Sequence, residues 1–214
     1  MAASLKAMPG AWLWLVFGFE NIGREARERL AGIVRALGAV HGEFQVVLLG
    51  GERLHDLSYA NGALSIFRGA AEVMWPDPEP GDVTGIPVVE PARYARAMAL
   101  AGGHPLLASE LLHVDGDEQT LSATLRQHPL LIRTVLALNG DRVACDRLRR
   151  YAGQRDLGPF VLIYADPVIR GLWWHNLICK NPMTARLGWR SAAIRESVGE
   201  LLELLAGAAV AGAD

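Results

Sequence analysis

The sequence predicts an α/β fold, in which a β-α-β unit at the N-terminus is followed by a mixed or mostly parallel sheet with flanking helices. Two short apolar runs, residues 12–17 and 44–49, have the length and the aromatic and β-branched content of buried strands. A third apolar run at 160–165 is bounded by Gly-Pro and Asp-Pro. A long amphipathic segment, 191–205, follows near the end of the chain. Strand and helix patterns that alternate in this way are typical of a sheet covered by helices.

The composition indicates a globular chain with a sizeable core. Of the 214 residues, 51% are hydrophobic and 21% are charged, which excludes a disordered protein. We predict a single α/β domain over residues 1–214. Residues 75–91 contain five prolines, at positions 76, 78, 80, 87 and 91, and form either a stiff surface loop or a subdomain boundary. The loop is favoured, because neither half looks complete without the other.

Charge and cysteine content narrow the choice of partners and compartment. The net charge of −2 offers no general attraction for nucleic acid or for an anionic membrane surface. Cys145 and Cys179 form neither a disulfide framework nor a CxxC metal motif, so we expect reduced thiols in a cytoplasmic protein. Lysine occurs only at Lys6 and Lys180, which is typical of a GC-rich, bacterial-like coding bias. The apolar stretch 11–19 lacks a signal-peptide cleavage site, and no window reaches the roughly 18 apolar residues of a membrane span.

The N-terminal elements come first in the chain. The strand at 12–17 leads through the loop GFENIG, residues 18–23, into an amphipathic helix at 24–37 that ends at Gly38. The strand at 44–49 would then pair in parallel through a right-handed crossover. The loop is neither a GxGxxG fingerprint nor a P-loop, and an anion held on helix amides is the less favoured interpretation. His55-Asp56 follows the second strand and is a weaker candidate for a site there.

The middle of the chain alternates short elements with turns. Residues 63–68 follow Asn61-Gly62 and are predicted as a short strand. Helices are expected at 91–100, 105–113 and 118–127, separated by glycine-containing turns. A further helix is expected at 191–205, where apolar residues recur at helical spacing.

The segment 128–151 has two competing interpretations. Asn139-Gly140 between apolar runs indicates a β-hairpin, whereas LLIRTVLAL also suits a buried helix and would give a pair of helices. The stretch Pro-Leu-Leu-Ile-Arg at 129–133 resembles the carboxyl-terminal part of arsenate reductase and Spx-like proteins of the thioredoxin fold, which implies a strand pair after it. The resemblance covers about two dozen residues. The loop at 18–23, where that family carries its reactive cysteine, has none, so the activity is not implied here.

The run 160–165 and the residues after it form the candidate site. Asp166 would lie at the carboxyl end of a buried strand, where open α/β sheets bind ligands, and Pro167 would begin a helix that Asp166 caps. Taken singly, such an aspartate is more often only a cap, and paired tryptophans more often belong to a core or an interface. The predicted binding residues are Asp166, Trp173, Trp174, His175, Asn176, Lys180 and Arg186.

Two functional hypotheses follow. The sequence contains no recognised catalytic, nucleotide or metal-binding motif, and we expect no cofactor. The first hypothesis is a non-catalytic accessory or protein-interaction protein on an enzyme-like scaffold. Its aromatic segments, or the leucine-rich helix at 191–205, would bind a protein partner or a second copy.

The alternative is an enzyme that acts on a small anionic or phosphate-bearing substrate around residues 166–186. Asp166 would be the acid/base or metal partner, His175 the proton carrier, and Lys180 and Arg186 the anion clamps, with Cys179 as a variant nucleophile. A nucleic-acid role is third, because it depends only on the arginines at 142–155. These are more simply a solvated helix face.

Overall fold

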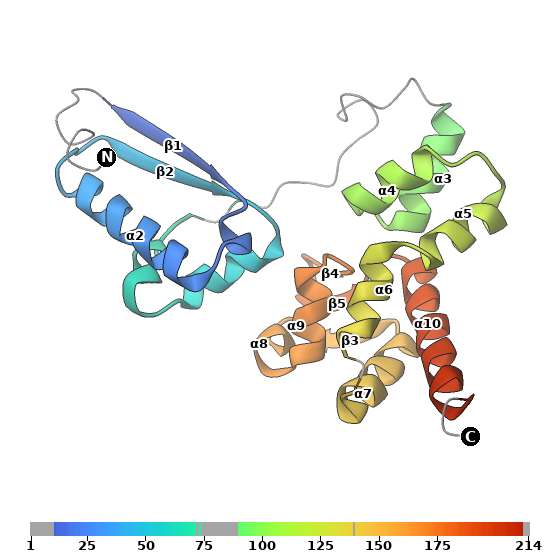
Figure 1. Cartoon of the computed structure of the whole chain (residues 1–214). Coiled ribbons are helices and arrows are strands. Elements are labelled where there is room, and N and C mark those ends of the chain that lie inside the picture. The colour runs from blue at the N-terminus through green and yellow to red at the C-terminus, as the bar shows by residue number, and fades with distance from the viewer. Residues whose placement is uncertain (1–10, 72, 74–89, 139, 212–214) are drawn as a thin grey trace. The chain divides into compact units, whose positions relative to one another are not determined.

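The computed structural model describes residues 11–71, 73, 90–138 and 140–211, with side chains to residue 207. The structure combines helices and strands and includes a small parallel sheet. The chain divides into two compact units, residues 1–74 and 75–214 (Figure 1). The predicted proline-rich loop at 75–91 lies outside the described residues except for its last two positions.

Unit 1 contains the strands predicted at 12–17 and 44–49. β1 (Trp12–Phe17) and β2 (Phe44–Leu49) pair in parallel, from Trp12 opposite Phe44 to Phe17 opposite Leu49. The helix α2 (Arg24–Gly38) lies between them in the chain and buries Val34 and other apolar residues of its inner stripe. The predicted helix and both strands therefore form at the expected positions, because their apolar periodicity is long and regular.

The described residues of unit 1 also include three short 3₁₀ helices. These are η1 (Phe19–Asn21), η2 (Glu52–Tyr59) and η3 (Gly62–Phe67). The strand predicted at 63–68 is wrong. Leu64 and Phe67 are three residues apart and both pack on the unit 1 core, a spacing that a 3₁₀ turn satisfies and an alternating strand does not. The rings of Phe67 and Phe19 meet edge to face at 5.4 Å.

Unit 2 is mainly helical and carries one small antiparallel sheet. Its strands, β3 (Asp156–Pro159), β4 (Ile178–Lys180) and β5 (Arg186–Trp189), are ordered β3-β5-β4. The helices are α3 (Pro91–Ala101), α4 (Pro105–Leu112), α5 (Glu118–Arg126), α6 (Pro129–Leu136), α7 (Arg142–Ala152), α8 (Leu162–Ala165), α9 (Pro167–Trp174) and α10 (Ala192–Ala211). The helices predicted at 91–100, 105–113, 118–127 and 191–205 are thus confirmed, within a few residues at their ends.

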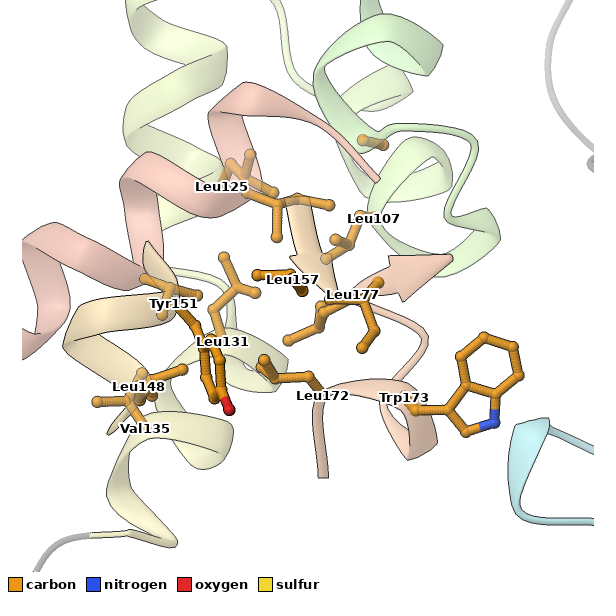
Figure 2. Close-up of a cluster of buried hydrophobic side chains, with 14 of the residues drawn as sticks. Leu107, Leu125, Leu131, Val135, Leu148, Tyr151, Leu157, Leu172, Trp173 and Leu177 are labelled. Carbon is orange, nitrogen blue, oxygen red and sulfur yellow. The ribbon is translucent and has the colours of Figure 1, made fainter. Parts of the chain in front are cut away.

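The core of unit 2 lies where α10 packs against α5, α6 and α7 and where α9 packs on the sheet. Leu131, Leu148 and Leu172 come from three different helices and meet there, each at most 1% exposed (Figure 2). Four of the helices begin with proline at the first or second position, where no amide donor is needed. Each of these four helices therefore has a well-defined first residue.

The strand predicted at 160–165 is wrong, because these residues form a turn followed by α8. The amide of Ile163 donates to the carbonyl of Phe160, and that of Tyr164 donates to Val161, as in a helical turn. Ile163 is buried, but Val161 is 60% exposed, so the apolar run does not cross a sheet. The strand of this region is β3, which ends at Pro159, since proline has no amide to extend the ladder. Where a mixed or mostly parallel sheet was expected, the described residues form a two-stranded parallel sheet and a three-stranded antiparallel sheet.

The helix-pair interpretation of 128–151 is correct, and the β-hairpin is wrong. α6 and α7 begin at capped positions, His128 and Asp141, whose side chains accept hydrogen bonds from the amides of Leu130 and Ala144. The two N-caps stabilise the start of both helices, and this favours the helix pair over the hairpin that Asn139-Gly140 indicated. The strand pair that the resemblance to arsenate reductases implies is therefore absent from these described residues.

Candidate functional site

Asp166 is buried at the start of α9 and is fully engaged. Its Oδ1 accepts hydrogen bonds from the amides of Val168, at 2.8 Å, and Ile169, at 3.3 Å. Its Oδ2 accepts from the Tyr151 hydroxyl at 2.7 Å and lies 3.5 Å from the guanidinium of Arg147. Burial, reinforced by the Asp166 carboxylate, raises the pKa of Tyr151 above its usual value. Asp166 is thus an N-cap that also ties α7 to α9.

The two tryptophans belong to the core of unit 2. Trp173 is 3% exposed, and its ring meets that of Phe160 edge to face at 5.2 Å. Its indole nitrogen is enclosed and has no hydrogen-bond partner among the described residues. Trp174 is half-buried and packs on the same core. Neither indole therefore offers an exposed stacking platform.

His175 and Asn176 lie at the other end of α9. The Nδ1 of His175 lies 2.9 Å from the Thr134 hydroxyl. Asn176 has a φ of 57°, and its side-chain oxygen Oδ1 accepts two hydrogen bonds from the guanidinium of Arg190, at 2.9 and 2.7 Å. The backbone of Asp166 and that of His175 are separated by about 13 Å along the helix, at a rise of about 1.5 Å per residue.

Lys180 and Arg186 have separate partners. The Lys180 ammonium lies 4.6 Å from the centre of the Phe160 ring, a cation–π geometry. Arg186 donates to the exposed carboxylate of Asp156 at 2.6 Å, and this ion pair lowers the pKa of Asp156. Phe160 is the one side chain in these contacts that both Trp173 and Lys180 touch. The seven predicted residues are therefore distributed over both ends of α9 and the small sheet.

Two histidines that the sequence analysis did not select are buried near His175. His104 and His128 each open the tetrapeptide His-Pro-Leu-Leu, and each ring accepts a hydrogen bond from an amide of the helix that follows. Because Nδ1 accepts, the neutral ring carries its proton on Nε2. The Nε2 of His104 donates to the carbonyl of His175 at 3.1 Å, and that of His128 lies 2.9 Å from a Glu110 oxygen. The repeated tetrapeptide is the signal that reveals this cluster.

Unit 2 is expected to lose stability as the pH falls below about 6.5. Burial lowers the pKa of His104 from its ordinary value near 6.5, so below pH 6.5 the unfolded chain binds more protons than the folded chain. The stabilisation that depends on a neutral His104 is complete above pH 6.5. It is lost as the pH falls from 6.5 through the lower pKa that His104 has in the folded chain. Urea denaturation at pH 7.5 and pH 5.0 measures the loss. His104→Asn keeps an N-cap that does not titrate and should show a smaller difference; an equal difference in both proteins would contradict this assignment.

The parallel sheet of unit 1 has one covered face and one exposed face. Val16, Val46 and their neighbours at alternate positions pack on the unit 1 core with α2. On the opposite face, Leu13, Leu15, Phe17 and Val47 are 59%, 53%, 73% and 41% exposed. In the register of the sheet, Leu15 lies opposite Val47 and Phe17 opposite Leu49. The exposed face is completed by Gln45, opposite Leu13, and contains no charged residue.

Comparisons with known proteins give no match. No family model, curated protein or solved structure is significantly similar to the chain. Within the described residues, no group of three or more histidine, cysteine or acidic side chains is arranged to hold a metal ion. In the same part of the chain, no helix combines the length and the apolar character of a membrane span.

Proposed function

We propose that the protein is a non-catalytic, cytoplasmic accessory protein that self-associates through the exposed face of the β1/β2 sheet. The observation that carries this proposal is an exposed apolar face on a parallel sheet, formed by Leu13, Leu15, Phe17 and Val47 with the partly exposed Leu49. Parallel sheets in globular proteins are almost always covered on both faces. This apolar patch on a sheet of a kind that is otherwise covered is the surface to which we assign the interaction.

A second copy of the chain is the occupant that fits this face. The face carries no charge, so it presents nothing for a partner of opposite charge to match. In a two-fold contact the same patch serves both subunits and needs only to be self-complementary. Two flat apolar sheet faces achieve this by aligned packing about 10 Å apart.

The size of the face sets the expected affinity. Two strands of six residues form a face of roughly 20 by 10 Å. Two such faces bury on the order of 500 Å², which is below the ~1,200 Å² of a standard stable interface. We therefore expect a weak dimer that forms only at higher protein concentration.

Leu15→Glu is expected to abolish self-association. The new carboxylate would be buried between two apolar faces without a partner, a cost that a weak dimer does not survive. Sedimentation velocity over a range from micromolar to several hundred micromolar protein measures the effect. Leu204→Glu is the matched control, because Leu204 is 69% exposed on α10 and lies outside the face.

Three outcomes would contradict the proposal. A wild-type chain that stays monomeric over the whole range has no self-association to explain. Persistence of the dimer in Leu15→Glu would remove the sheet face from the interface. Loss of the dimer in Leu204→Glu would place the interface on α10 instead.

The contacts of residues 166–186 favour structural roles, so no observation favours the alternative of an enzyme for a small anionic substrate.

A further inference from the structure

A hollow in unit 1 lies where the two parallel strands end. β1 and β2 run in the same direction, so the segments that follow them emerge at the same edge of the sheet. These segments and the start of α2 line a cavity of about 140 Å³. A cavity of about 140 Å³ has room only for a small ligand, and the carboxyl edge of parallel strands is the usual position of ligand sites in α/β folds.

Two side chains that line the hollow each have a buried polar atom without a hydrogen-bond partner among the described residues. One oxygen of Glu20 accepts a hydrogen bond from the amide of Gly51 at 2.8 Å, but its other oxygen, Oε2, is enclosed without a partner among the described residues. The same holds for the Nε of Arg27. Buried polar atoms are nearly always paired, so an unpaired acceptor and an unpaired donor on two lining side chains leave capacity for a further polar partner at this place.

Gly50 makes room for the Glu20 carboxylate. A Cβ at Gly50 would lie 2.3 Å from a Glu20 oxygen. The absence of a side chain at this position therefore lets the carboxylate reach the strand edge and the amide of Gly51. The hydrogen bond and the close approach fix the position of the carboxylate at the wall of the hollow.

The charges around the hollow are balanced. Its lining includes two carboxylates, Glu20 and Asp56, and two guanidiniums, Arg27 and Arg53. A simple anion such as phosphate would meet both carboxylates, and a simple amine would meet both guanidiniums. A zwitterion matches both pairs. The remaining wall is apolar and includes Phe19.

We propose that this hollow binds a small zwitterion with an apolar side chain, of the class of free α-amino acids. Arg27 and Arg53 bind the carboxylate, since guanidinium groups pair with carboxylates in planar, charge-assisted geometry. Glu20 and Asp56 bind the ammonium group. Phe19 and Leu57, both buried, contact the apolar side chain. This site is separate from the sheet face and from residues 166–186.

Calorimetric titration of the full chain with the twenty common L-amino acids tests the proposal. We expect saturable binding of at least one apolar amino acid, for which L-leucine is the reference probe. 4-Methylpentanoate lacks the ammonium group and 3-methylbutylamine lacks the carboxylate, so each should bind at least about tenfold weaker than L-leucine. Absence of binding by all twenty amino acids at millimolar concentration would overturn the proposal. Binding of 4-methylpentanoate and 3-methylbutylamine with the same affinity as L-leucine would also overturn it.

Glu20→Gln and Arg27→Gln are expected to weaken binding of the amino acid at least about tenfold, because each removes one charge of the balanced set. Glu20→Gln keeps an oxygen that accepts from Gly51, and an unchanged melting temperature without ligand verifies the fold. Arg29→Gln is the matched control, since Arg29 lies on the same helix, 76% exposed at its side chain and paired with Glu25. Unchanged affinity in both test variants would overturn the assignment, whether or not the control binds.

Discussion

Asp166→Ala is expected to lose about 3 kcal/mol of unfolding free energy, combining about 1 kcal/mol for a lost N-cap with about 2 kcal/mol for a buried hydroxyl left unpaired. The carboxylate accepts from two amides of α9 and from the Tyr151 hydroxyl at 2.7 Å. Alanine removes all three acceptor contacts at once, and Tyr151 is too buried for water to replace them. Urea denaturation at pH 7.5 measures the difference.

Two milder variants separate the contributions of Asp166. Asp166→Asn keeps an oxygen that can cap α9 and should lose less than half as much stability as the alanine variant. Tyr151→Phe removes the hydroxyl but leaves the cap intact, so it should also fall between the wild type and Asp166→Ala. If Asp166→Ala were as stable as the wild type, the carboxylate would not be a structural cap, and a catalytic role for it would regain weight.

Gly102→Ala is expected to destabilise unit 2 by about 3 kcal/mol, from about 1 kcal/mol for a left-handed alanine and about 2 kcal/mol for overpacking. Gly102 ends α3 with a φ of +58°, and a Cβ there would lie 2.3 Å from the carbonyl carbon of Arg190. The guanidinium of Arg190 also donates to the carbonyl of Gly102 at 3.1 Å. The neighbour is backbone and cannot turn away, so the two segments must separate.

Gly171→Ala is the matched control for this effect. Gly171 lies inside α9, and a Cβ there would meet nothing within 4 Å. Alanine at that position should raise stability by about 0.5–1 kcal/mol, because it lowers the entropy lost on folding. Thermal and urea denaturation of both variants give the comparison. Equal effects of the same sign would mean that the close approach of Gly102 to Arg190 does not govern stability.

The interpretations that succeeded depended on local chemistry. The apolar runs of β1 and β2 and the amphipathic stripe of α2 were recognisable because each repeats its pattern over at least six residues. Asp166 was correctly predicted as a helix cap, since Asp-Pro is a strong start signal. The capping histidines were equally local, and the repeated His-Pro-Leu-Leu would have revealed them.

The candidate site could be predicted only in part, because its interpretation depended on a strand at 160–165. That run is apolar enough for either a strand or a buried helical turn, and the choice depends on the available partners. β5 lies between β3 and β4, so both of its edges are already paired and no further strand can join it. The amide of Phe160 donates to the carbonyl of Ala185, and the chain then turns into α8. Asp166 then caps a helix inside unit 2 instead of lying at the end of a strand.

The sequence by itself determined where the N-terminal strands and most helices begin and end, because caps, prolines and apolar periodicity act within one or two turns of chain. Tertiary structure alone decided how β3, β4 and β5 pair and which distant groups the polar side chains contact, since these choices depend on residues far apart in sequence. Asp166 meets Tyr151, and Asn176 meets Arg190, only after folding. The same long-range placement leaves the face of β1 and β2 exposed and opens the hollow beside Glu20.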